Sequence, residues 1–227
     1  MRVFIPQVYL IRPADRYPFR TVSEKHGLRY IPQLRYTKED KMYGLVNKAV
    51  EQMVCVQFGE EVWETIKAQA GVDIDAFMSM EGYPDEVTYR LIAAASTVLN
   101  LPAAQVLEAF GEYWVRYTAS EGYGELMQLA GSTLPEFLQN LDNLHARIGL
   151  TFTHLKPPSF QCTDATDDTM RLHYYSTREG LAHMVIGLLR GLGERFHTTV
   201  SVTQACDRSV GADHDEFIVQ YHDKTPL

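Results

Sequence analysis

The 227-residue sequence is poor in cysteine and contains no long apolar run. Its three cysteines, Cys55, Cys162 and Cys206, are odd in number and widely spaced, which argues against a disulfide framework and for a reducing compartment. No stretch approaches the roughly 18 consecutive apolar residues of a membrane span, and the start of the sequence lacks the pattern of a secretory signal. These absences predict a cytoplasmic protein with no membrane partner.

Positive charge is also scarce, because 21 Lys and Arg stand against 29 Asp and Glu for a net charge of −8. Nucleic-acid binding depends on neutralising phosphates, so the sequence predicts no nucleic-acid partner. The Gly-x-Ser-x-Gly, phosphate-loop and His-Glu-x-x-His motifs are all missing. We therefore expect that the chain is not an enzyme.

The composition that remains, 45% hydrophobic and 22% charged, is that of one globular domain or two small ones. A core of this size can enclose a prosthetic group without help from disulfides. Residues 1–41 differ from the rest, because they carry 9 Lys and Arg against 4 Asp and Glu and show no helical period. We interpret residues 1–41 as a poorly structured extension.

Residues 42–149 are helical in pattern, with apolar side chains three and four positions apart and helix start and stop signals between segments. Five or six helices fit. The expected helices span 43–56, 60–71, 85–100, a segment that opens at Pro102, and 134–149 with Ser132 or Thr133 as the N-cap. The segment after Pro102 has a wide aromatic face that includes Trp114, which is more typical of a core than of a cofactor site.

The pattern changes after Pro157-Pro158, a pair that cannot lie inside a helix. The remaining residues predict a mixed α and β part with strands at 160–163, 170–176, 198–205 and 216–221 and a helix at 180–196. The fold class is therefore predicted as α+β.

His145 lies beside an apolar stripe that includes Leu141, Leu144 and Ile148. A neutral imidazole in that position can bind a metal or haem iron through one nitrogen while a second partner orients the other. The alternative is a hydrogen-bonded histidine at the edge of the core, which the pattern alone favours.

Tyr174, Ser176 and Arg178 share one face if the strand continues through them, because strand side chains alternate. Two hydroxyls and a guanidinium fork on one face suit a ligand with two carboxylates. The alternative is a strand end with a solvated arginine and a packed tyrosine.

Other polar clusters predict no site. The acidic pairs Glu60-Glu61, Asp85-Glu86 and Asp167-Asp168 lie in expected caps and loops, and we interpret them as solvated surface. His214 and His222, with Asp213 and Asp215, have a spacing that matches no standard metal site.

Taken together, these motifs resemble the H-NOX family, the haem nitric oxide/oxygen binding domains related to the haem domain of soluble guanylate cyclase. The resemblance runs from Met42 to about Asp223 and is similar above all to stand-alone cyanobacterial members. It is carried by 42–47 (MYGLVN), 111–114 (GEYW), 141–145 (LDNLH), Pro157-Pro158 and Tyr174-x-Ser176-x-Arg178. It implies residues 42–106 as a helical distal subdomain and 107–227 as a mixed α/β proximal subdomain with an antiparallel sheet, with haem b between them.

The resemblance also implies roles for single residues. His145 matches the proximal ligand of the ferrous iron, Tyr174, Ser176 and Arg178 match the clamp on the haem propionates, and Pro158 matches the proline that keeps the porphyrin non-planar. Because residue 42 falls where such domains begin, we interpret residues 1–41 as a start-site artefact, with a partner-binding arm as the alternative.

The distal pocket decides which gas binds, since bound oxygen needs a hydrogen-bond donor that NO and CO do not need. Oxygen-binding members carry a tyrosine at a position that corresponds here to Met184. Val46, Val50 and Trp114 complete an apolar pocket in this comparison, which predicts binding of NO and CO with little affinity for O₂. If His183 occupies that position instead, the chain is an oxygen sensor or a haem enzyme.

The function implied is a gas-driven switch. Release of His145 on NO binding would free its helix and let the subdomains rotate, and a separate partner protein, commonly a histidine kinase or a diguanylate cyclase, would receive the signal. A plain helical interaction module, with a structural His145, is the rival interpretation.

Overall fold

The computed structural model describes residues 41–152 and 156–223. The predicted extension therefore lies outside the described residues, except for Lys41. Lys41 opens a short strand, β1 (Lys41–Tyr43), that pairs antiparallel with β2 (Gly82–Pro84) in a two-stranded ribbon that the sequence did not predict.

Four helices build the first part of the chain: α1 (Gly44–Phe58), α2 (Glu60–Ala70), α3 (Asp85–Val98) and α4 (Ala103–Thr118). The bounds of α1, α2 and α3 and the start of α4 agree with the predicted helices to within about two residues, because the sequence carries strong helix start and stop signals there. Gly59 and Gly71 end α1 and α2 at positive φ, which glycine adopts without a steric penalty. Pro84 and Pro102 directly precede α3 and α4.

The region after α4 is more broken than predicted. A kinked segment, η1 (Ala119–Tyr123), in which Gly122 has a φ of 95°, leads into α5 (Gly124–Ala130), which the sequence did not predict. The single helix expected over 134–149 is wrong, because α6 (Leu134–Gln139) and α7 (Leu141–Gly149) are separate helices that meet at Asn140, whose φ of −98° and ψ of 5° leave the helical range. Thr133 is the N-cap of α6, as predicted, and its hydroxyl accepts a hydrogen bond from the Glu136 amide.

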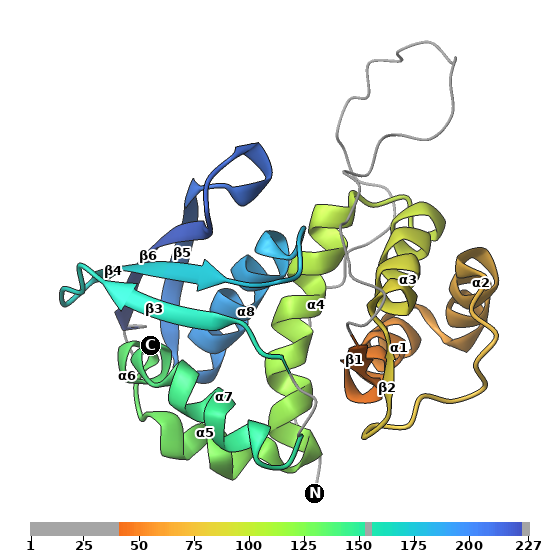
Figure 1. Ribbon diagram of the computed structural model, residues 1–227, viewed down its shortest axis with the longest axis horizontal. Helices are drawn as coiled ribbons and strands as arrows, with labels where there is room; N and C mark the ends of the chain where they lie inside the picture. The colour runs from red at the N-terminus through yellow and green to blue at the C-terminus, as the bar shows by residue number, and fades with distance from the viewer. Residues whose placement is uncertain (1–40, 153–155, 224–227) are drawn as a thin grey trace, which may run out of the picture. The chain divides into compact units, whose positions relative to one another are not determined.

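The C-terminal part is an antiparallel sheet of four strands with the order β3-β4-β6-β5. Its elements are β3 (Ser159–Thr163), β4 (Thr169–Tyr175), α8 (Ala182–Arg195), β5 (Thr198–Cys206), the 3₁₀ turn η2 (Arg208–Val210) and β6 (Asp215–Asp223). In β4 the predicted alternation holds, since Met170, Leu172 and Tyr174 are buried while their neighbours are not. The helix α8 packs beside the sheet, and α5, α6 and α7 lie below it in Figure 1.

The helices and the antiparallel sheet confirm the predicted α+β class. They enclose two hydrophobic cores. One core is formed by α1 to α4 and the other by α5 to α8 with the sheet. The helix α4 contributes Phe110 to the first core and Val115 to the second, so it lies between the two parts (Figure 1). The subdomain boundary predicted between residues 106 and 107 falls inside this helix.

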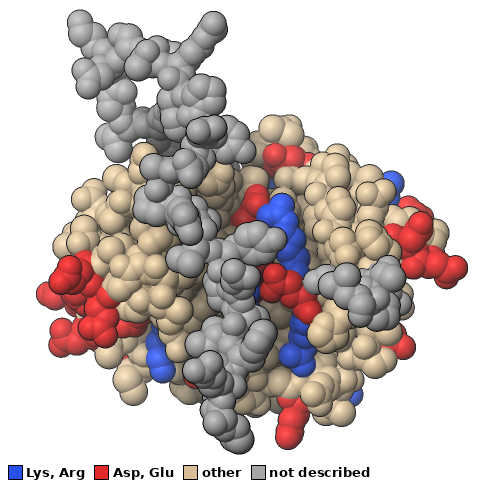
Figure 2. Space-filling view, turned by 180° about the vertical axis from the view of Figure 1, so that it is seen from behind, with Lys and Arg blue, Asp and Glu red and all other residues tan. Residues whose placement is uncertain are grey.

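The helices α4 and α8 cross at two glycines. A Cβ atom at Gly111 would lie 2.2 Å from the Met184 carbonyl oxygen, and one at Gly187 would lie 2.0 Å from the Glu108 carbonyl oxygen. Ion pairs flank the crossing, with Glu108 2.6 Å from Arg190 and Arg116 3.2 Å from Glu194. Figure 2 shows acidic and basic side chains side by side down the middle of the face opposite to that of Figure 1.

Within the described ranges, no single helix is long and apolar enough to cross a membrane. One pair of segments, 85–98 with 103–130, meets the length and composition criteria only jointly, and its members are bent by 115°.

Candidate functional site

An apolar cavity of about 300 Å³ lies between the two cores. Its walls come from α1, α3, α4, α7, β4, α8 and the segment 156–158, so it draws on both parts of the fold. The cavity lining includes eight residues that bear on its chemistry: Val46, Trp114, His145, Pro158, Tyr174, Ser176, Arg178 and Met184. The sequence predicted all eight of these as site residues.

His145 presents one nitrogen to this cavity. Its Nδ1 lies 3.2 Å from the carbonyl oxygen of Pro158, and because a carbonyl only accepts hydrogen bonds, Nδ1 carries the proton and Nε2 keeps a lone pair. Burial lowers the pKa of His145 below its ordinary value, which favours the neutral ring. A neutral imidazole whose other nitrogen is fixed by a backbone carbonyl is the form in which histidine binds metals.

The helix that carries His145 is fastened to the sheet by Asp142. The Asp142 carboxylate accepts hydrogen bonds from the Ser159 hydroxyl and the Phe160 amide, each at 2.7 Å. The rings of His145 and Phe160 are also in contact, with centroids 5.9 Å apart. The position of the imidazole is therefore linked to the start of β3 by three contacts within one turn of α7.

The Tyr174, Ser176 and Arg178 group does line the cavity, but the strand argument that predicted it is wrong. The strand β4 ends at Tyr175, so only Tyr174 reaches the cavity through strand alternation. Ser176 and Arg178 follow in a turn, in which the Ser176 hydroxyl accepts a hydrogen bond from the Arg178 amide at 3.1 Å. This turn replaces the strand because a serine hydroxyl can satisfy a backbone amide locally.

Asp85, which we interpreted as solvated surface, is buried against Arg178, so that interpretation is wrong. Its side chain is 1% exposed and its carboxylate receives the Arg178 guanidinium through Nε at 2.7 Å and Nη2 at 3.2 Å. Asp85 lies in the first turn of α3, and Arg178 joins it to β1 through a further hydrogen bond to the Lys41 carbonyl. A charge buried this deeply requires a partner, and Arg178 is that partner.

Arg178 retains capacity for a further acceptor. Besides the two bonds to Asp85, Nη1 donates to the Lys156 carbonyl at 3.0 Å and Nη2 donates to the Lys41 carbonyl at 3.1 Å. Among the contacts that the structure describes, these occupy four of the five guanidinium N–H groups. One N–H remains for a carboxylate in the cavity, and Asp85 fixes the direction in which it points.

On the α8 side of the cavity, the wall contains Met184 rather than His183. The His183 ring lies outside the cavity lining, and its Nδ1 is 3.0 Å from a Glu108 carboxylate oxygen. Val46 of α1 and Trp114 of α4 also line the cavity, as predicted, but Val50 does not. Val50 is buried one helical turn further along α1, where it packs inside the first core, so its assignment to the pocket is wrong.

Cys162 lies on β3, where burial raises the pKa of its thiol to about 11. A thiol with such a high pKa is a poor nucleophile at neutral pH, because the thiolate is the reactive form.

These features define a class of protein. An apolar enclosure, a neutral imidazole with an oriented lone pair, and an arginine with a spare N–H beside two hydroxyls fit an apolar prosthetic group that carries a metal ion and carboxylate substituents. The residues present therefore fit a metal-bearing macrocycle with acidic side groups.

The comparisons with known proteins identify the family. A family model described as haem-NO-binding matches residues 43–204, so the chain belongs to the haem-NO-binding (H-NOX) family. The soluble guanylate cyclases gcy-31 and gcy-32 of Caenorhabditis elegans are 29% and 31% identical over 80% and 79% of this chain. The matches cover 26% and 27% of those proteins, so the chain spans about a quarter of their length.

Solved structures share the fold. An H-NOX protein from Shewanella oneidensis in the Fe(II)NO state has a TM-score of 0.74 at 21% identity, and the match covers 80% of this chain and all of that one. The Fe(II) unliganded H-NOX protein from K. algicida has a TM-score of 0.70 at 17% identity, over 82% of this chain and all of that one.

Proposed function

We propose that this chain is a haem-based sensor of NO and CO that holds ferrous haem b through His145 and has little affinity for O₂. The observation that carries the proposal is the imidazole of His145, whose Nδ1 is fixed on the Pro158 carbonyl so that the Nε2 lone pair is left for the apolar cavity. The bound haem would supply an iron centre that takes up a diatomic gas.

The residues at the rim of the cavity would hold the acidic edge of the cofactor. The remaining N–H of Arg178 and the hydroxyls of Tyr174 and Ser176 are the groups for the two propionates, and Asp85 acts as a positioning residue for Arg178. Pro158 has two functions, since its carbonyl orients His145 while its rigid ring lies in the cavity wall.

Gas selectivity follows from the side chain at residue 184. A bound O₂ carries negative charge that a hydrogen-bond donor must stabilise, and the thioether of Met184 donates no hydrogen bond. The imidazole of His183 is committed to Glu108 outside the cavity. NO and CO bind without such a donor, so they are the expected ligands.

The chain would signal by conformational change and not by catalysis. Asp142 and the Pro158 carbonyl fasten α7 to the segment before β3 and to its first residues, so a change in the force on His145 is passed directly to the sheet. The receiver we propose is a separate protein, either a histidine kinase or a diguanylate cyclase. Such a switch requires two states to which the gas binds unequally.

Absorption spectroscopy of the dithionite-reduced full chain under argon, air, CO and NO tests the proposal. We expect a Soret band that shifts with CO and NO, does not move on first exposure to air, and loses its five-coordinate ferrous form in His145→Gly but not in the matched control His183→Gly. A stable oxygen complex would overturn the gas selectivity and support the oxygen-binding alternative. A colourless protein after haem supplementation would overturn the sensor and support a helical interaction module.

A further inference from the structure

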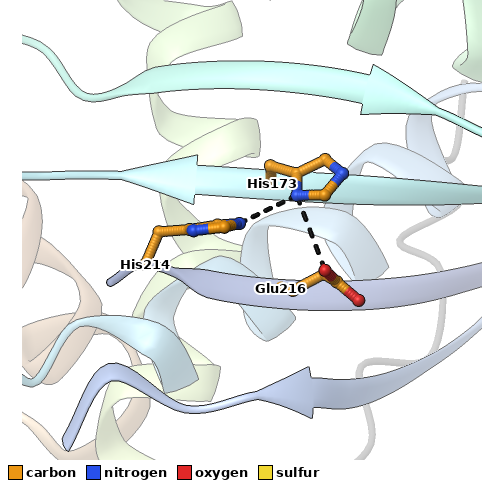
Figure 3. Close-up of side chains that lie close together, drawn as sticks. All are labelled: His173, His214 and Glu216. Atoms are coloured by element: carbon orange, nitrogen blue, oxygen red, sulfur yellow. Dashed lines mark hydrogen bonds and ion pairs between the residues drawn. The ribbon is translucent and has the colours of Figure 1, made fainter. Parts of the chain in front are cut away.

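A cluster of side chains of the types that can ligate a metal ion lies on the sheet, on the face away from the cavity. His173 of β4 and Glu216 of β6 are directly opposite each other in the strand register, and His214 lies just before β6. Figure 3 shows the three side chains turned toward one another, and one ligand atom from each lies within 4.8 Å of the others. Leu172 and Tyr174, the neighbours of His173, point to the other face and line the cavity.

Outer partners orient both imidazole rings of this cluster. The Nδ1 of His214 is 2.6 Å from an Asp213 carboxylate oxygen, which only accepts hydrogen bonds, so Nδ1 carries the proton and Nε2 faces the cluster with a lone pair. The Nε2 of His173 is 2.9 Å from the Thr163 hydroxyl, so its Nδ1 faces the cluster and donates a hydrogen bond to the His214 Nε2 lone pair. Binding of a metal ion at Nδ1 requires this proton to move to Nε2, where the Thr163 hydroxyl oxygen can accept it as a hydrogen bond. A carboxylate or hydroxyl on the far nitrogen is the arrangement found around metal-binding histidines.

The inner atoms are close to coordination spacing. His214 Nε2 and His173 Nδ1 are 2.8 Å apart, and His173 Nδ1 is 3.6 Å from Glu216 Oε2. Tetrahedral bonds of about 2.0–2.1 Å place two nitrogen ligands roughly 3.3 Å apart, so the rings need to separate by about half an ångström. A small χ rotation achieves this, because the side chains of His173, His214 and Glu216 remain 16%, 15% and 11% exposed.

The charge around the cluster also favours a cation. Glu216 shares its other oxygen, Oε1, with Arg171, and Arg171 is paired in turn with Asp164 at 3.1 Å. Two acidic groups, Asp164 and Asp213, therefore accompany the Arg171–Glu216 pair. The Tyr175 ring stacks on His214 with centroids 4.4 Å apart and holds the imidazole in place.

We propose that His173, His214 and Glu216 bind one late first-row divalent transition-metal ion, with Zn²⁺ as the reference ion and a fourth position open to water. Two imidazoles and one carboxylate are a ligand set that Zn²⁺ accepts with an open position. Neutral imidazole is preferred by these ions over the Mg²⁺ and Ca²⁺ that select oxygen ligands. The site is separate from the cavity and shares only the β4 backbone with it.

Equilibrium dialysis of the haem-loaded full chain against buffered Zn²⁺, with zinc and iron counted separately by elemental mass spectrometry, tests the site. We expect one zinc per chain in the wild type and in His222→Gln, a matched control that removes an exposed histidine from the same strand, β6. Loss of an outer partner typically weakens metal binding by about 10-fold to 100-fold, and loss of a ligand should weaken it at least as much. We expect zinc binding to weaken in this way in His173→Gln, His214→Gln and Glu216→Gln.

A second variant separates a metal site from an ordinary hydrogen-bond cluster. Asp213→Asn keeps all three ligands but removes the charge behind His214, and it should lower the zinc affinity by about 10-fold to 100-fold with the circular dichroism spectrum unchanged. Zinc binding that is absent in the wild type would overturn the site. So would zinc that persists in His214→Gln, since it would then be held elsewhere, for example by the exposed Cys206. Iron content and the Soret band report on the cavity alone, so their loss leaves this test intact.

Discussion

Arg178 and Asp85 form a buried ion pair whose two members are 9% and 1% exposed. Removing one partner of such a pair leaves an uncompensated charge in the interior, so we expect Arg178→Ala to lower the free energy of unfolding by about 3–5 kcal/mol. Urea unfolding at neutral pH measures the loss.

The matched control is Arg190→Ala, which breaks the more exposed pair with Glu108. Exposed pairs contribute about 0–1 kcal/mol, so this variant should remain close to the wild type. An equal loss of unfolding free energy in the two variants would mean that the buried Arg178–Asp85 pair stabilises the fold no more than the exposed pair does.

Met184 controls oxygen binding in the proposed sensor. Met184→Tyr adds a hydroxyl donor to the cavity wall, so we expect a ferrous oxygen complex that the wild type does not form. The absorption spectrum in air after reduction measures it.

His183→Tyr is the control for Met184→Tyr, because residue 183 lies on the same helix but outside the cavity lining. If the two variants behave alike in air, the donor does not act from residue 184, and the gas selectivity has another origin.

At the scale of helices, the crossing of α4 and α8 has no room for a side chain. Gly187→Ala would place a methyl group 2.0 Å from the Glu108 carbonyl oxygen, so the helices must separate. We expect a loss of at least about 1–3 kcal/mol in the free energy of unfolding, measured by urea titration.

Gly149→Ala is the matched change on another helix, because nothing lies within 4 Å of the added atom. It should leave stability unchanged or raise it by up to about 1 kcal/mol. A Gly187→Ala variant as stable as Gly149→Ala would show that the crossing is looser than its geometry indicates.

Some helix boundaries could be predicted from the sequence and others could not. The bounds of α1 to α3 and the start of α4 follow from local signals such as Gly59 and Pro102, so the sequence predicts them closely. The break at Asn140 does not follow from the sequence, since the apolar period runs through the point where α6 and α7 separate.

Some site residues could likewise be predicted from the sequence, whereas others depend on contacts between distant parts of the chain. His145 and Pro158 are recognisable in the sequence, but the burial of Asp85 depends on a contact with a residue 93 positions away. The proposed zinc site depends on the register of β4 against β6, which places His173 opposite Glu216 and which no local pattern fixes.

At the scale of the whole molecule, the cavity of about 300 Å³ makes stability depend on its occupant. A ligand present at 100 times its dissociation constant adds about 2.7 kcal/mol, which corresponds to roughly 5–10 °C in the unfolding midpoint of a domain this size. We therefore expect the haem-free chain to melt lower than the haem-loaded chain in a circular dichroism scan.

His145→Gly provides the internal control for this scan, because it keeps the cavity but lacks the proposed iron ligand. Its midpoint should rise less on haem addition than that of the wild type. Identical midpoints with and without haem in the wild type would contradict a cofactor bound in the cavity.

The backbone contact of α4 with α8 has a mechanical consequence. Because the two helices approach through their backbones at Gly111 and Gly187, a turn of one helix on the other in the proposed switch would pivot at this point. The end of α8 lies eight residues beyond Gly187, a lever arm of about 12 Å, so each degree of rotation moves it by about 0.2 Å. In the proposed switch, a small rotation at the crossing would therefore become a larger displacement where α8 leads into β5, the edge strand of the sheet.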